Sequence, residues 1–157
     1  MKRGYDIAFF KAIMKTIHRS PYNFSVGTDI ICGFPTETEQ QFSNSMQFAE
    51  DMGFSYIHAF SYSSRPGTAA YRRFGHGDRE TAKKRVRLMR QLGEKLKYNF
   101  ENNQIGRNCT VLVEDNLKGL TETFIQVEIK GEKRGALVEC RLEKKQESPL
   151  IIKALSI

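Results

Sequence analysis

The chain has 157 residues and a net charge of +7, and 39% of its residues are hydrophobic and 27% charged. These values are typical of one or two ordinary globular domains. No apolar run approaches the roughly 20 residues that a membrane-spanning helix needs. The basic N-terminus leads into an amphipathic stretch rather than an apolar signal core, so we expect a cytoplasmic protein that has no membrane partner.

The three cysteines, Cys32, Cys109 and Cys140, stand far apart in the sequence. This dispersed, odd-numbered set argues against a disulfide framework and matches no metal-binding spacing. Free cysteine is among the most buried residue types, so we expect three buried thiols and no metal ligands.

Helical and extended patterns alternate along the first part of the chain. Apolar residues recur at helical spacing over 6–19, and an extended run follows over 24–32. A second helix is predicted to end near residue 52, and a second strand to cover 55–62. This order of helices and strands predicts a parallel sheet with crossover helices.

A long helix is predicted over roughly 79–102. One of its faces is apolar, and Lys83, Arg87 and Arg90 lie on another face. Between residues 65 and 97, eleven Lys or Arg residues stand against three acidic residues. Such a concentration of positive charge indicates a polyanionic partner such as nucleic acid, or else a solvated helix face.

The composition changes at about residue 106, where short β-rich runs begin. Four or five short strands in some fifty residues predict a small β-barrel or sandwich. We therefore expect two domains, over residues 1–103 and 104–157. The β-rich runs are 111–113, 124–129, 136–142 and 150–154.

The segment from Thr28 to Glu39, Thr-Asp-Ile-Ile-Cys-Gly-Phe-Pro-Thr-Glu-Thr-Glu, is the most informative in the sequence. It predicts a turn that follows a parallel strand at the carboxyl edge of the sheet, where α/β proteins bind ligands. Gly33 permits close backbone approach to a ligand or a positive φ. Glu37 opens a helix N-terminus, where the dipole favours a carboxylate, and from the residues alone a purely structural role is the favoured alternative.

A second segment, running from Gly53 through an aromatic strand to Tyr-Ser-Ser-Arg-Pro-Gly-Thr, places polar groups at the same kind of strand end. Tyr62, Ser63 and Arg65 are the candidates there, since the guanidinium of Arg65 suits a carboxylate or phosphate. Arg65 could instead form a surface ion pair, and Tyr62 could be a core ring. We interpret His58 as a packing residue.

The two segments, in this order and about thirty residues apart, resemble the end of the catalytic barrel of radical-SAM tRNA methylthiotransferases. The second segment resembles most closely the branch that acts on threonylcarbamoyladenosine in tRNA, then the isopentenyladenosine branch, then the ribosomal-protein branch. The resemblance implies an α/β fold, the C-terminal part of a partial TIM-like parallel β/α barrel. It also implies residues that bind S-adenosylmethionine: Asp29, Ile31, Gly33, Glu37, Tyr62, Ser63 and Arg65.

The segment Gly119 to Val127 resembles the Gly-x-Thr-Glu-Asn-Tyr core of the TRAM domain, although Thr123 and Phe124 depart from it. This implies a small antiparallel OB-like β-barrel that binds tRNA. RNA contact needs cations for phosphates and rings for unstacked bases, although Phe124 could instead be a core residue. The candidate RNA-binding residues are Lys118, Thr121 and Phe124 in this module and, from the charge of the long helix, Lys83, Arg87 and Arg90.

Members of this family use S-adenosylmethionine and two [4Fe-4S] clusters to insert a methylthio group at C2 of a modified adenosine, here N6-threonylcarbamoyladenosine at position 37 beside the anticodon. The sequence lacks the clustered cysteines that hold iron–sulfur clusters. We therefore expect this chain to supply cofactor-pocket walls and binding to the tRNA anticodon stem-loop, and to depend on a missing N-terminal part for activity. The alternatives are a stand-alone RNA-binding module and an unrelated nucleotide-binding α/β domain without a Gly-rich phosphate loop.

Overall fold

The computed structural model describes residues 4, 6–115, 117–144 and 152–156. Its contacts divide into two compact units. The first unit comprises Met1–Ser20 and Val26–Lys97, and the second, here called the barrel unit, comprises Pro21–Ser25 and Tyr98–Ile157. The predicted domain limits, 1–103 and 104–157, stay a prediction. No helix among the described residues is long and apolar enough to cross a membrane.

Two helices of the first unit begin and end at clear capping signals. Helix α1 (Ile7–Arg19) begins at Asp6, whose carboxylate accepts a hydrogen bond from the Phe9 amide at 2.8 Å. Helix α2 (Glu39–Met52) begins at a capping box in which Thr38 and Gln41 bond each other's backbone amides. It ends at Gly53, which takes the left-handed conformation with φ of 61°.

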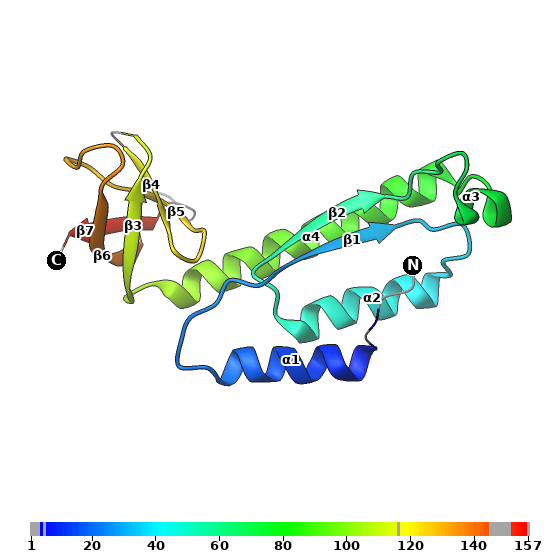
Figure 1. Cartoon of the computed structure of the whole chain (residues 1–157), viewed down its shortest axis with the longest axis horizontal. Helices are drawn as coiled ribbons and strands as arrows, with labels where there is room; N and C mark the ends of the chain where they lie inside the picture. Colours follow the sequence, from blue (N-terminus) through cyan, green and yellow to red (C-terminus); the bar gives the residue numbers. More distant parts are fainter. Residues whose placement is uncertain (1–3, 5, 116, 145–151, 157) are drawn as a thin grey trace. The chain divides into compact units, whose positions relative to one another are not determined.

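The sheet of the first unit has two parallel strands (Figure 1). Strand β1 (Gly27–Cys32) pairs with β2 (Tyr56–Ser61), so that Cys32 lies opposite Ser61. One further bond, from the Tyr62 amide to the Cys32 carbonyl at 2.8 Å, closes this end. The predicted parallel pairing is confirmed, and both strands finish at one edge.

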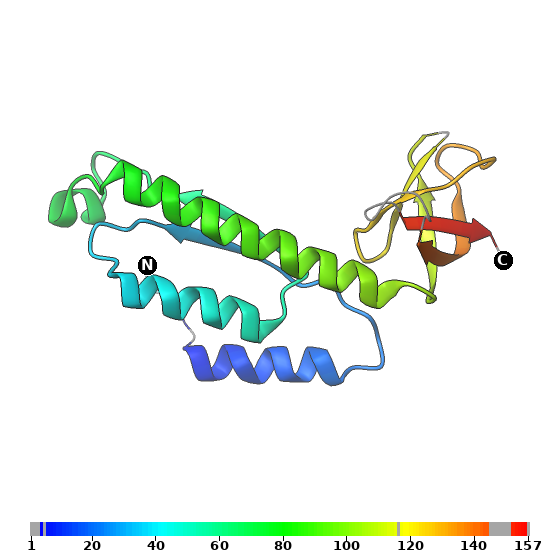
Figure 2. The same cartoon turned by 180° about the vertical axis from the view of Figure 1, so that it is seen from behind.

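Helix α4 (Arg79–Gln104) covers one face of this sheet, as Figures 1 and 2 show from opposite sides. Its apolar stripe packs into the core of the first unit, as the 3.6-residue periodicity predicts. A short helix, α3 (Ala69–Phe74), follows β2 and was not predicted. The buried core of the first unit consists of Met14, Cys32, Phe42, Ala49, Met52, Phe54, Ala59, Val86, Met89, Leu92 and Leu96.

The opposite face of the sheet is open among the described residues. Asp29 and Ile31 of β1 lie on it, paired in register with His58 and Phe60 of β2. Ile31 is 48% exposed and Phe60 50%. An apolar sheet face is usually packed against another layer.

The barrel unit holds five strands that close into a ring in the order β3-β4-β5-β7-β6. Four pairings are antiparallel, as predicted, but β5 and β7 are parallel. Strand β4 was not predicted. The strands are β3 (Asn108–Val113), β4 (Lys118–Thr121), β5 (Gln126–Glu128), β6 (Leu137–Lys144) and β7 (Ile152–Ser156).

The interior of the barrel is apolar, and alternate residues along β3 supply it, as the two-residue period of a strand requires. Phe100 and Ile105, at the end of α4 and just after it, pack against this core. The buried residues of the barrel core are Cys109, Val111, Val113, Ile125, Val127, Ile129, Cys140 and Leu142.

Candidate functional site

The carboxyl ends of β1 and β2 form a rim with a small cavity, which we call the rim cavity. Gly33, Tyr62 and Ser63 line one side, and the start of α4 lines the other. Its volume is about 210 Å³. Pockets for drug-sized ligands span roughly 300–1,000 Å³, so the rim cavity is large enough for only part of a nucleoside cofactor.

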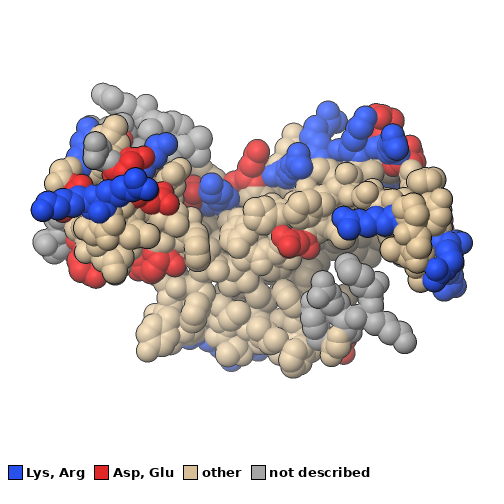
Figure 3. Space-filling model, turned by 45° about the horizontal axis from the view of Figure 1, so that its top comes forward, with Lys and Arg blue, Asp and Glu red and all other residues tan. Residues whose placement is uncertain are grey.

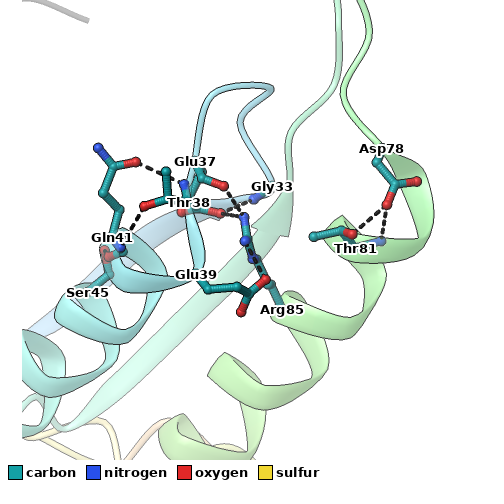
Figure 4. A network of polar contacts seen from close by, with 9 residues as sticks. All are labelled: Gly33, Glu37, Thr38, Glu39, Gln41, Ser45, Asp78, Thr81 and Arg85. Carbon is teal, nitrogen blue, oxygen red and sulfur yellow. Dashed lines mark hydrogen bonds and ion pairs between the residues drawn. The ribbon is translucent and has the colours of Figure 1, made fainter.

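Gly33 is fixed at the rim by its conformation and by its neighbour. Its φ is +78°, and a Cβ built on it would lie 2.4 Å from the Cβ of Ala82. The Gly33 amide donates a hydrogen bond to Oε2 of Glu37 at 2.7 Å (Figure 4). Glu37 therefore points back into the turn and holds the backbone of the rim.

Arg85 reaches from α4 to the turn that holds Glu37 and Glu39 (Figure 4). Its Nη1 donates to Oε2 and to the carbonyl of Glu37, both at 2.8 Å, and its Nη2 donates to Oε1 of Glu39 at 2.6 Å. Its guanidinium also lies over the ring of Phe42. Burial alone would lower the pKa of Arg85, but the hydrogen bonds that it donates to Glu39 and Glu37 raise that pKa, so the side chain stays charged.

Sequence reasoning missed Arg85 because it was counted with the basic residues of a solvated helix. A signal was present: Arg85 stands three residues after Ala82 and four before Met89, on the apolar stripe of α4. A charged residue on a buried stripe needs a partner, and the carboxylates of Glu37 and Glu39 are the partners.

The other predicted cofactor residues lie in two places. Asp29 and Ile31 project from the open face of the sheet rather than into the rim cavity. Arg65 lies beyond the rim, exposed, and its carbonyl accepts a hydrogen bond from Oγ1 of Thr68 at 2.8 Å, just before α3. The structure thus brings Gly33, Tyr62 and Ser63 together, and places Arg65 outside the lining of the cavity.

Asp78 closes the α4 side of the rim cavity. Its carboxylate accepts hydrogen bonds from the backbone amides of Glu80 at 3.2 Å and Thr81 at 3.0 Å, and also from the Thr81 hydroxyl (Figure 4). The bonds from Thr81 and Glu80 lower the pKa of Asp78. The first amides of α4 are thus already bonded to a carboxylate.

The predicted phosphate-binding residues Lys83, Arg87 and Arg90 share one exposed face of α4. They line a groove of about 500 Å³ between that helix and the end of β2, which we call the basic groove. Figure 3 shows Lys and Arg side chains gathered over α4. The expected basic face is therefore present, whereas its ligand stays a prediction.

The predicted RNA-binding residues of the barrel unit differ in exposure. Lys118 is exposed at the start of β4. Thr121 is buried, and its Oγ1 accepts from the Ile125 amide at 3.0 Å and lies 3.0 Å from the Thr123 hydroxyl. Phe124, which stands between Thr123 and Ile125 in the sequence, is 72% exposed and has a φ of 61°. The alternative that Phe124 is a core residue is wrong.

The three cysteines are buried thiols, as expected from their spacing. Burial raises the pKa of Cys32 to about 11 and that of Cys109 to about 12. Within the described ranges, no three Cys, His, Asp or Glu residues are grouped to hold a metal ion. These residues do not fit an iron–sulfur cluster, which needs several converging thiolates.

Comparison with known proteins finds relatives that are named as tRNA methylthiotransferases. It is 38% identical over 131 residues to the probable threonylcarbamoyladenosine tRNA methylthiotransferase of Methanocaldococcus jannaschii, a match that covers 83% of this chain. It is 34% identical over 139 residues, 88% of the chain, to the threonylcarbamoyladenosine tRNA methylthiotransferase of Aquifex aeolicus. This chain belongs to the tRNA methylthiotransferase family.

A relative from the second predicted branch, the tRNA-2-methylthio-N6-dimethylallyladenosine synthase of Ruthia magnifica, is 30% identical over 96% of the chain. The chain spans about a third of its relatives' length: 30%, 34% and 36% of these three. No family model matches it. The predicted membership of the methylthiotransferases is confirmed, and the partial coverage is consistent with the predicted C-terminal portion.

Proposed function

We propose that this chain is the C-terminal part of an enzyme that attaches a methylthio group to C2 of N6-threonylcarbamoyladenosine at position 37 of tRNA, beside the anticodon. The observation that carries the proposal is the identity of 30–38% with named methylthiotransferases over most of the chain. The threonylcarbamoyl substrate is favoured because that name belongs to the relatives with 38% and 34% identity. Such an enzyme would act on tRNA in the cytoplasm.

The role we assign to the first unit is to form one wall of an S-adenosylmethionine site. Gly33, Tyr62 and Ser63 would contact the cofactor at the rim, and Asp29 and Ile31 would contact it from the open sheet face. Parallel sheets bind ligands at the carboxyl edge, which supports this role. We assign Glu37 to holding the rim backbone and Arg65 to a contact beyond the cavity.

These residues would supply only a binding surface for the cofactor and none of the reaction chemistry. When bound, S-adenosylmethionine and two [4Fe-4S] clusters would provide the radical and sulfur chemistry, and the ligands of the clusters would come from the parent enzyme outside this chain. A two-stranded sheet with an open apolar face fits the last part of a TIM-like barrel whose other strands lie in that missing N-terminal part.

The role we assign to the barrel unit is that of a TRAM-like, OB-like RNA-binding module. The order β3-β4-β5-β7-β6, closed by a parallel β5–β7 pair, supports a Greek-key barrel of the OB type, a fold that binds oligonucleotides. Phe124 would offer its ring to a base of the anticodon stem-loop, Lys118 would contact phosphate, and buried Thr121 would hold the turn.

A chimera tests the proposal. The corresponding third of the Aquifex enzyme is replaced by this chain, and the chimera is produced in a strain that lacks the modification. Mass spectrometry of digested tRNA should show 2-methylthio-N6-threonylcarbamoyladenosine, and the unmodified Aquifex enzyme is the positive control. A product on dimethylallyladenosine instead would overturn the substrate assignment, and loss of both products from a folded chimera would overturn the enzyme assignment.

The alternative, a stand-alone RNA-binding module, is not favoured. The named relatives are enzymes, and the match runs through the first unit as well as the barrel unit, since it covers up to 96% of the chain. RNA binding alone does not require a rim at the carboxyl ends of two parallel strands.

A further inference from the structure

The basic groove beside α4 adjoins the rim cavity, because two residues line both of them. Both are lined by Ser61, the last residue of β2, and by Lys83. A ligand in the groove can therefore continue to the rim without leaving the surface of the first unit. The groove is about 500 Å³ and the rim cavity about 210 Å³.

The cations of the groove are available to a ligand. Arg87 has no polar partner in the part of the chain that the structure describes. Among the described residues Lys83 pairs with Glu80 alone, at 2.7 Å, in an exposed contact that is worth little. Arg90 donates one bond to the Ala59 carbonyl, at 3.3 Å, which holds its guanidinium against β2 and leaves further N–H groups free.

The spacing of these cations suits successive phosphates. Lys83, Arg87 and Arg90 are four and three residues apart, which places them on one helix face at intervals of roughly 6 and 4.5 Å along the axis. Neighbouring phosphates in a nucleic-acid strand are separated by a single sugar, a comparable length. A carboxylate lies at each end of this row of cations. Glu94 lines the basic groove beyond Arg90, and Asp78 lines the rim cavity.

We infer that the basic groove binds two consecutive phosphates of a single RNA strand and directs the next base to the rim. The inference rests on the proposed function, because it takes the polyanion to be the tRNA substrate. A paired A-form helix could place phosphates on α4 but could not turn a base into the rim cavity, whereas loop nucleotides can be unstacked. The Tyr62 hydroxyl, which is buried and has no partner among the described residues, is a polar group near the path of that base.

Binding measurements on the whole chain test the inference. A labelled seven-nucleotide single strand, the corresponding stem-loop and a duplex are titrated at several salt concentrations. Replacement of all three cations, K83Q with R87Q and R90Q, should lower the salt slope for the single strand by about 1.4, the value for two phosphates. The control for the position of a charge is K84Q, which removes one positive charge from an exposed residue of the same helix outside the groove.

The route to the rim has its own measurement. An RNA with a photoreactive 4-thiouridine next to the bound phosphates should crosslink to the peptide that holds Tyr62 and Ser63. The crosslink should disappear in the triple variant and persist in K84Q. A duplex that binds as tightly as the single strand, or a K84Q slope that falls as far as that of the triple variant, would overturn the inference.

The outcomes separate the two proposals. If the stem-loop binds but the groove variants leave its salt slope unchanged, the groove inference fails and the tRNA assignment stands. If any unstructured strand binds with the α4-dependent slope and the chimera yields no methylthiolated nucleoside, the groove stands and the proposed enzyme fails.

Discussion

Gly33 is held by two constraints at once, a positive φ and the close approach of Ala82. Gly67 provides a comparison, because its φ is +84° but no atom lies within 4 Å of a Cβ built there. The two glycines therefore separate backbone strain from steric overlap.

Gly33→Ala should lower the free energy of unfolding by about 2–4 kcal/mol. The left-handed backbone contributes about 1 kcal/mol of this loss and overpacking against Ala82 about 1–3 kcal/mol. Gly67→Ala should cost only the backbone part, about 1 kcal/mol. Urea denaturation of both variants measures the difference. Equal losses would mean that Ala82 moves away and that the rim is not rigidly packed against α4.

Phe124 is the described non-glycine residue with a positive φ, and its ring is exposed. The amide of Phe124 donates to the Thr121 carbonyl at 3.0 Å, and buried threonine hydroxyls fix the same turn. A strained conformation that holds a large apolar ring in water is typical of a residue kept for contact.

Phe124→Gly should leave the free energy of unfolding unchanged or raise it by up to about 1 kcal/mol, because glycine adopts this backbone without strain. If the ring stacks on a base, RNA affinity should fall by about 5- to 150-fold, equivalent to about 1–3 kcal/mol. Denaturation and anisotropy titration of the same sample give both values. Unchanged affinity would remove Phe124 from the RNA surface.

At the scale of elements, Arg85 ties α4 to the turn between β1 and α2. Its side chain is 6% exposed and that of Glu37 is 14% exposed, whereas that of Glu39 is 79% exposed. The bond to Glu37 therefore contributes most of the coupling, because the pair with Glu39 is screened by water.

Arg85→Met should destabilise the first unit by about 3 kcal/mol, because it leaves the largely buried Glu37 carboxylate without its cation. The double variant with Glu37→Gln should recover part of that loss. Thermal denaturation monitored by circular dichroism measures the change, with Lys84→Met as the control on an exposed position of the same helix. A loss no greater than that of the control would mean that the ion pair contributes nothing.

The elements differ in how far the sequence predicted them. The periodicity of α4, the capping box of α2 and the two parallel strands were all readable, because each depends on residues a few positions apart. Strand β4 and helix α3 were missed. Both are short, and Lys118–Thr121 has little apolar alternation, so its extended form depends on pairing with β3 and β5.

At the scale of the whole molecule, each unit has its own core and its own buried thiols. Cys32 belongs to the core of the first unit, and Cys109 and Cys140 belong to the core of the barrel. Burial raises all three pKa values, so the native thiols stay protonated and inert at neutral pH.

Thiol labelling along a urea titration should therefore report each unit separately. Cys32 should react at a lower urea concentration than the barrel pair, because the first unit leaves an apolar sheet face open. Single-cysteine variants followed by mass spectrometry make the comparison. Simultaneous labelling at every urea concentration would mean that the two units unfold as one.

The same thiols give a pH dependence whose sign follows from their raised pKa. Below pH 9 the Cys32 thiol is protonated in both states, and its contribution to stability is complete. Between about pH 9 and 11 the unfolded chain releases the proton first, so the stability of the first unit should fall. Urea midpoints that are flat over this range in wild type, and equal to those of Cys32→Ala, would contradict this.

The sequence by itself determined the order of the helices and strands apart from α3 and β4, the uneven charge and the family, because these are properties of neighbouring residues and of sequence motifs. It also gave the correct expectation that β1 and β2 end at one edge, since parallel pairing requires it. Only the tertiary structure decided that Glu37 turns toward Arg85, that Arg65 lies beyond the rim cavity, and that Phe124 is exposed. Those outcomes depend on how side chains far apart in the sequence pack together. Glu37 and Arg85, for example, are 48 positions apart. The pattern of residues along the chain does not specify such contacts.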